Sequence, residues 1–169
     1  MNKFNEDSRV KIPAILHLIR HGYEYKSLKN TKWDYKTNIF TEIFQESICK
    51  INSELNRKDV IKTFEELKII LDNDDLGKAF YEKIIHQSPI KLIDLEDFNK
   101  NSFHVVTELP YRNGDEEFRP DITILINGLP LIFIEVKKPN NKEGILAEHN
   151  RIIKRFQNSK FKTFEYRSQ

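Results

Sequence analysis

The chain has 169 residues, a length that suits one domain with a single hydrophobic core. Its 28 Lys and Arg nearly balance 26 Asp and Glu, so the net charge of +2 does not indicate a polyanion-binding protein. A hydrophobic fraction of 38%, with 12 Phe and 6 Tyr, excludes a disordered chain. The single cysteine, Cys49, excludes a disulfide framework and a multi-cysteine zinc site, and favours a reducing, cytoplasmic location.

Membrane proteins and nucleotide-driven motors are excluded as well. The N-terminus lacks an apolar signal sequence, and no stretch approaches the ~18 apolar residues of a membrane span. The glycines form neither a Walker A motif nor G-x-G-x-x-G. The charge is uneven, because residues 136–169 carry nine Lys/Arg and three Asp/Glu, a net +6 against −4 for residues 1–135. A solvated helix face and a phosphate-facing surface both fit this basic end.

Helical patterns dominate residues 10–87. Pro13 suits the first turn of a helix that Gly22 ends. An apolar stripe at i, i+3, i+4 spacing over 39–55 predicts a second helix, and capping-type residues open two more, over about 59–71 and 74–86. A further helix is expected near the end of the chain, over about 143–158.

Strand patterns fill residues 90–138, the expected core of a sheet. We expect a short strand over 90–94 and a longer one over 102–109. The β-branched runs 122–126 and 131–137 are joined by Asn127-Gly128, which predicts a hairpin. Because these runs are continuously apolar, we expect both strands at the centre of the sheet with helices on both faces. The prediction is a single α/β (α+β) domain, residues 1–169, with a helical N-terminal half.

Two carboxylates and a lysine mark the open end of this hairpin. Asp121 precedes the first run and Glu135-Val136-Lys137 ends the second, so an antiparallel hairpin brings them together. Such oxygen ligands suit Mg²⁺, and a metal with an adjacent ammonium serves phosphodiester hydrolysis. Val136 should point to the opposite face and pack in the core.

Because side chains alternate along a strand, this site requires a particular register of the hairpin. With a two-residue loop and a regular ladder, Asp121 would lie opposite Ile134, on the wrong face for Glu135. We therefore predict a three-residue loop or a β-bulge, either of which pairs Asp121 with Glu135. The Asp…Glu-x-Lys pattern by itself arises often by chance in a chain with 32% charged residues.

Six stretches together point to a known family: Gly22–Tyr25, Ile39–Phe44, Asn101–Val106, Arg119–Ile122, Asn127–Leu131 and Ile134–Pro139. They resemble the N-terminal nuclease domain of the restriction (R) subunit of type I restriction–modification enzymes, over about residues 10–160. The resemblance implies a PD-(D/E)xK nuclease, in which a restriction-endonuclease-like mixed sheet flanked by helices cuts double-stranded DNA with Mg²⁺.

By this resemblance Asp121 and Glu135 would be metal ligands and Lys137 the catalytic lysine. Glu42 or Glu46, on an early helix, could add a carboxylate, or both could be ordinary solvent-face residues. Contacts to DNA phosphates, or a solvated helix face, are expected for a basic set: Lys138, Arg151, Lys154 and Arg155. The nearest match to the family's Gln-x-x-x-Tyr element begins at Gln157 and has Phe161 in place of Tyr.

Family R subunits continue into an ATP-dependent translocase, whereas no motor domain is present in this chain. ATP would therefore act only through that motor, and modification and specificity subunits would be further partners. The first hypothesis is a type I endonuclease domain that hydrolyses foreign DNA. A catalytically idle nucleic-acid or subunit-binding module on the same scaffold, and a stand-alone repair or junction nuclease, are the alternatives.

Overall fold

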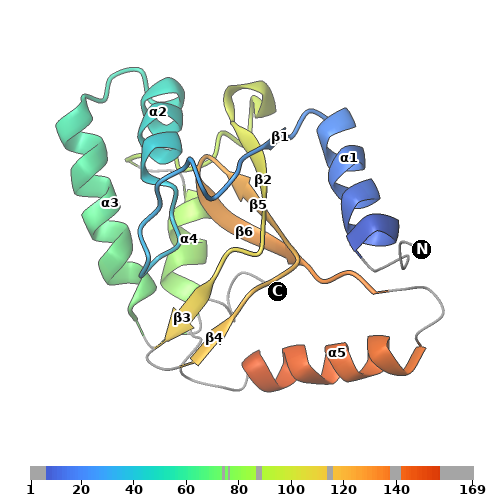
Figure 1. Cartoon of the computed structure of the whole chain (residues 1–169). Helices are drawn as coiled ribbons and strands as arrows, with labels where there is room; N and C mark the ends of the chain where they lie inside the picture. Colours follow the sequence, from blue (N-terminus) through green and yellow to red (C-terminus); the bar gives the residue numbers. More distant parts are fainter. Residues whose placement is uncertain are drawn as a thin grey trace.

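A four-stranded sheet lies at the centre of the molecule with helices on both sides, as the computed structural model shows (Figure 1). The structure describes residues 7–73, 75, 77–86, 89–113, 116–137 and 142–156. The helices are α1 (Ile12–Arg20, after a π-helical turn over Asp7–Lys11), α2 (Thr41–Ile51), α3 (Arg57–Leu71), α4 (Lys78–His86), the 3₁₀ turn Phe98–Lys100, and α5 (Lys142–Phe156). The strands are β1 (Glu24–Tyr25), β2 (Phe103–Thr107), β3 (Tyr111–Asn113), β4 (Glu116–Phe118), β5 (Ile122–Ile126) and β6 (Leu129–Ile134).

The main sheet is mixed, with the strand order β1-β2-β5-β6. β1 runs parallel to β2, while β2 with β5 and β5 with β6 are antiparallel. This confirms the expected α/β fold with a mixed sheet. The expectation that both hairpin strands are central is wrong for β6, because β2 occupies the other side of β5 and leaves β6 at the edge. Ile132 of β6 is accordingly 45% exposed, whereas Ile122, Thr123 and Leu125 of β5 are completely buried.

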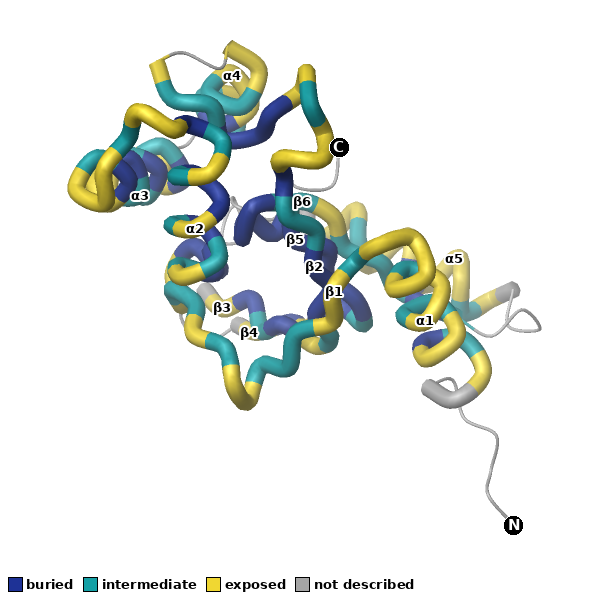
Figure 2. Tube along the Cα trace, turned by 90° about the horizontal axis from the view of Figure 1, so that it is seen from above, coloured by how far each residue is buried: buried dark blue, intermediate teal, exposed yellow. Residues whose placement is uncertain are grey.

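Helices cover the two faces of the sheet unequally. On one face α1 packs through Ile15 and Leu18 against Val105, Ile122 and Val136. On the other face lie α2, α3 and α4, so the buried strands run between two helical layers (Figure 2). No helix of the described residues combines the length and the apolar character needed to cross a lipid bilayer.

The α2 helix forms where the apolar stripe predicts it and is seated on the hairpin turn. Its buried side chains Phe44, Ser47 and Ile48 follow helical spacing. The Phe40 amide, just before the helix, donates to the Gly128 carbonyl at 2.9 Å. A β-carbon at Gly128 would lie 2.7 Å from the Phe40 carbonyl oxygen, so only glycine permits this approach. The start of α2 is thereby fixed at the turn end of the β5–β6 hairpin.

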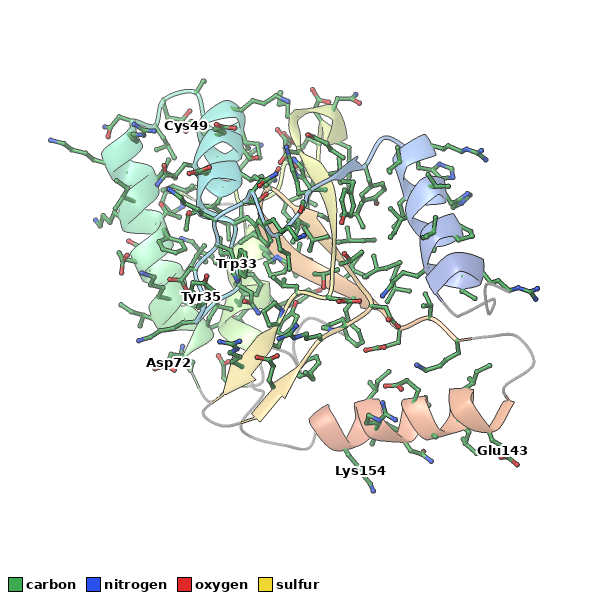
Figure 3. The ribbon with its side chains drawn as sticks, viewed as in Figure 1. Trp33, Tyr35, Cys49, Asp72, Glu143 and Lys154 are labelled. Atoms are coloured by element: carbon green, nitrogen blue, oxygen red, sulfur yellow. The ribbon has the colours of Figure 1, made fainter. Side chains whose placement is uncertain are left out.

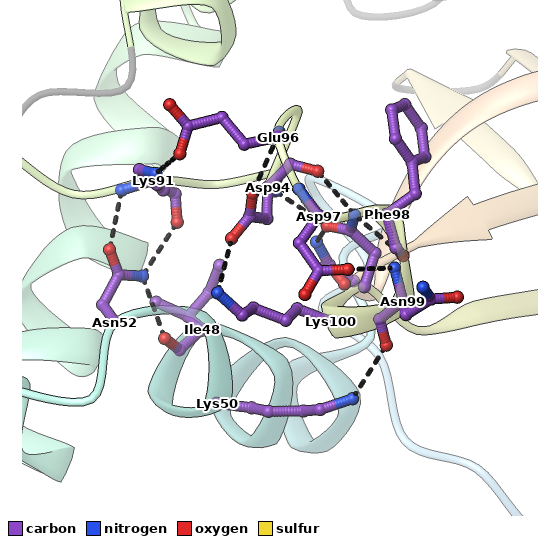
Figure 4. Close-up of polar contacts among 12 residues, drawn as sticks. Ile48, Lys50, Asn52, Lys91, Asp94, Glu96, Asp97, Phe98, Asn99 and Lys100 are labelled. Carbon is purple, nitrogen blue, oxygen red and sulfur yellow. Dashed lines mark hydrogen bonds and ion pairs between the residues drawn. The ribbon is translucent and has the colours of Figure 1, made fainter.

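The strand expected over Ile90–Asp94 is absent, and side-chain amides take the place of a neighbouring strand. Asn52 exchanges two hydrogen bonds of 2.9 Å with the backbone of Lys91 (Figure 4). Asn127 donates to the Leu92 carbonyl at 2.9 Å, and Asn101 accepts from the Asp94 amide at 2.9 Å. Because side chains satisfy these backbone groups, the segment is buried without a ladder.

A short ribbon, β3–β4, was not anticipated from the sequence. Its rings Tyr111 and Phe118 stack with centroids 5.0 Å apart and pack against Val106 and Leu125 of the main sheet. The ribbon thus covers part of the face that α2 also covers, near the entry to β5.

Candidate active site

The β5–β6 hairpin contains the predicted β-bulge. Its turn is the two-residue Asn127–Gly128, and both residues have positive φ, 53° and 77°. Leu125 pairs with Pro130, but Ile124 pairs with Ile132, so one extra residue is accommodated in β6. The bulge alternative is therefore confirmed, and the three-residue loop is not used.

The bulge sets the partner of Asp121. Beyond it Ile122 pairs with Ile134, the last pair of the ladder, and the same register continued by one position would set Asp121 opposite Glu135. Val136 points to the other face, where it is 6% exposed and packs with Val105 and Ile122, as predicted. Glu135 and Lys137, on either side of Val136, are only partly buried. The two carboxylates thus follow the last ladder pair at the same end of the sheet, and strand alternation continued by one residue predicts that they share a face.

Asp121 is held by two different groups. Its Oδ2 accepts a hydrogen bond of 3.0 Å from the Val136 amide, which anchors the chain leaving β6. Its Oδ1 lies 3.6 Å from Nζ of Lys11, and this ammonium also donates to Oε1 of Glu108 at 2.8 Å. Lys11 is only 8% exposed, so a buried positive charge sits directly beside the predicted metal ligand. Oδ1 of Asp121 is therefore already compensated by the Lys11 ammonium, with which any metal ion at this carboxylate would have to compete.

Glu108 reaches this end of the sheet through an unusual backbone. It follows β2 with φ of 55°, a left-handed conformation, and its amide donates to the Pro120 and Asp121 carbonyls at 3.2 and 3.4 Å. These bonds place Glu108 beside the residue that opens β5. Neither Glu108 nor Lys11 has a spacing in the sequence that marks it as part of the site.

Lys137 makes an ion pair with a residue that the sequence did not suggest. Its Nζ lies 3.5 Å from Oε2 of Glu148 in α5, and Nη1 of Arg151 lies 2.9 Å from the same oxygen. Glu148 is 4% exposed, although it is a carboxylate. One signal was present: Glu148 lies four residues before Ile152, at the spacing of an apolar contact position.

The helix carboxylates Glu42 and Glu46 lie elsewhere. Both are exposed on α2, which begins at the hairpin turn rather than at the end of the hairpin that holds Asp121. The negative charge of Glu46 acts on His104 of β2. No contact among the described residues brings either glutamate to Asp121 or Glu135.

The predicted DNA-contacting residues are divided between the described helix and undescribed segments. Arg151 and Lys154 are both exposed on α5, and the Arg151 side chain is 59% exposed. Lys154 points away from the sheet, as does Glu143 from another turn (Figure 3). Lys138, Gln157 and the side chain of Arg155 lie outside the described residues.

The donor set fits a Mg²⁺ ion that keeps several of its waters. Within the described ranges, no group of three or more His, Cys, Asp or Glu is arranged as a complete metal cage. Mg²⁺ commonly uses one or two carboxylates and completes its shell with water and phosphate oxygens. Asp121 and Glu135, which follow the last ladder pair Ile122–Ile134, could supply such a pair, with the ion taking the place of the Lys11 ammonium at Oδ1 of Asp121.

Known relatives identify the family of the chain. The family described as "Type I restriction enzyme R protein N terminus" matches residues 3–168. The chain is 32% identical to a Methanocaldococcus jannaschii protein named type I restriction enzyme MjaIXP endonuclease subunit, over 83% of this chain and 16% of that protein. It is 24% identical to the type I restriction enzyme HindI endonuclease subunit of Haemophilus influenzae, over 75% of this chain and 14% of the relative. The chain thus spans less than a fifth of the length of these relatives. Since the family matches nearly its whole length, the chain belongs to the type I restriction enzyme R protein N-terminal family.

Proposed function

We propose that this domain is a Mg²⁺-dependent DNA endonuclease that acts within a type I restriction system. The observation that supports the proposal is the bulged register, in which Ile122 pairs with Ile134, so that Asp121 and Glu135 would meet at the next position with Lys137 just beyond. The family membership and the names of the relatives support the restriction context. Modification and specificity subunits, and a motor elsewhere in the longer relatives, would complete the assembly.

The chain's own residues divide the work of phosphodiester hydrolysis. Asp121 and Glu135 would hold Mg²⁺, which when bound lowers the pKa of a coordinated water and neutralises phosphoryl charge. Lys137 presents an ammonium to the oxygens that gain negative charge as the phosphorus is attacked. The hydrogen bond from the Val136 amide fixes Asp121 relative to the backbone that carries this lysine. On α5, the exposed Arg151 and Lys154 would neutralise phosphates of double-stranded DNA.

The test is single-turnover nicking of supercoiled plasmid DNA with protein in excess over DNA. Wild type should nick with Mg²⁺ and not with EDTA, and Lys137→Ala should be slower by about 100-fold or more while folding normally. Lys62→Ala is the matched control, because Lys62 is an exposed lysine of α3 and is distant in sequence from the site residues. Full nicking by Lys137→Ala would refute the assignment, and DNA binding by wild type without nicking would favour a binding module.

A further inference from the structure

We infer that Glu148 of α5 is a positioning residue that holds the Lys137 ammonium in place for cleavage. The inference rests on the proposed function and deepens it, because it assigns to the reaction a residue outside the Asp…Glu-x-Lys pattern. It is carried by one contact across the fold, Lys137 Nζ to Glu148 Oε2 at 3.5 Å, and by the burial of that carboxylate.

The sheet alone does not fix the lysine. β6 ends at Ile134, and Lys137 lies three residues later, outside the ladder of backbone hydrogen bonds. The last anchor before it is the Val136 amide, which binds Asp121 and fixes the backbone but not the long lysine side chain. Four rotatable bonds separate the lysine backbone from Nζ, so a partner at the tip is needed to define where the charge lies.

Glu148 is suited to be that partner. Its side chain is 6% exposed, whereas that of Lys137 is 24% exposed, so the pair is screened poorly by solvent. A buried carboxylate is strongly disfavoured unless cations compensate it, and two cations do so here. Arg151 belongs to α5 itself, whereas Lys137 belongs to the predicted active site. The Lys137–Glu148 ion pair therefore links α5 to the active site.

The shared carboxylate also connects the site to the surface expected to meet DNA. Oε2 of Glu148 binds Lys137 and, at 2.9 Å, the guanidinium of Arg151, whose side chain is mostly exposed. Loss of the Glu148 charge should therefore disturb the lysine while leaving cations on α5 available to phosphate. This predicts a reduced cleavage rate without reduced DNA affinity.

The decisive variant is Glu148→Gln, which keeps the size of the side chain and removes its charge. We expect the single-turnover rate at saturating DNA to fall by about 10- to 100-fold, the range found when an outer-shell partner that orients a residue of a metal site is lost. The DNA dissociation constant should stay equal or decrease. Glu143→Gln is the matched control on an exposed turn of the same helix and should leave both quantities unchanged. Glu148→Asp, which keeps the charge, should recover part of the rate.

A readout without cleavage separates this inference from the proposed function. Urea unfolding gives the loss of stability for Glu148→Gln, for Lys137→Met and for the double variant. The loss in the double variant should differ from the sum of the two single losses, because both changes remove the same ion pair. Additive effects would overturn the inference even if no variant cleaves. A wild-type rate for Glu148→Gln beside an inactive Lys137→Ala would also overturn it, as would equal losses of rate and DNA binding. An active Lys137→Ala would instead remove the proposed function.

Discussion

Lys11→Met tests whether the buried ammonium stands where a divalent cation would bind. Methionine keeps most of the apolar length of lysine and removes the charge between Glu108 and Asp121. Breaking a fully buried ion pair costs about 3–5 kcal/mol, and an exposed pair contributes about 0–1 kcal/mol. Here Lys11 is 10% exposed by its side chain, but its partners are 58% and 25% exposed. We therefore expect an intermediate loss of about 2 kcal/mol in the free energy of unfolding.

The assay is urea denaturation in EDTA and then in excess Ca²⁺. A cation bound to the folded state at 100 times its dissociation constant stabilises it by about 2.7 kcal/mol. The variant should gain more from Ca²⁺ than wild type does, because in wild type the ion competes with the Lys11 ammonium for Asp121. Lys62→Met, at an exposed position, is the control for removing a lysine charge. Equal stability of Lys11→Met and wild type in EDTA would refute this reasoning.

Three further predictions address the turn, a buried histidine and the basic helix. Gly128→Ala should lose about 3 kcal/mol of stability in urea, from left-handed strain plus the close approach of its β-carbon to the Phe40 carbonyl. Gly22→Ala, with positive φ but open space around it, should lose only about 1 kcal/mol. Burial lowers the pKa of His104 in the folded protein, so as the pH falls the unfolded chain binds a proton at this residue before the folded chain does. The free energy of unfolding should therefore decrease as the pH drops below about 6.5. In His104→Gln this dependence on pH should be absent. Lys154→Ala should reduce the slope of log affinity for DNA against log salt by about 0.9, measured by fluorescence anisotropy; an unchanged slope would exclude a phosphate contact.

Local patterns predicted the elements whose determinants are local. The stripe beginning at Ile39 gave α2, because its apolar residues recur at helical spacing and are buried together. Asn127-Gly128 gave the hairpin, since both residues adopt positive φ in the turn. Strand parity and the need to pair Asp121 with Glu135 limited the hairpin to a three-residue loop or a β-bulge, and the structure has the bulge.

Long-range pairings could not be predicted in the same way. Strand order decides that β6 is an edge, and nothing within its own sequence contains that information. Lys11 and Glu108 are 97 residues apart in the chain, so their contact depends on how α1 and the end of β2 are brought together. The segment Ile90–Asp94 has a strand-like composition but is held by the amide side chains of Asn52, just after α2, and of Asn127 in the hairpin turn. Residues that contact a site from distant parts of the chain are therefore harder to predict from the sequence than residues that belong to a motif.

The bulge explains why a short acidic motif is insufficient evidence for such a site. If the register of Leu125 with Pro130 continued unchanged, Asp121 would face Ile134 and its carboxylate would lie on the opposite side of the strand from Glu135. One extra residue in β6 changes that parity without altering the motif. The spacing of the two carboxylates in the sequence therefore indicates a shared site only when the register of the hairpin is also known. A relative with the same residues but no compensating bulge or odd-length loop would place them on different faces, and its nuclease activity should be absent.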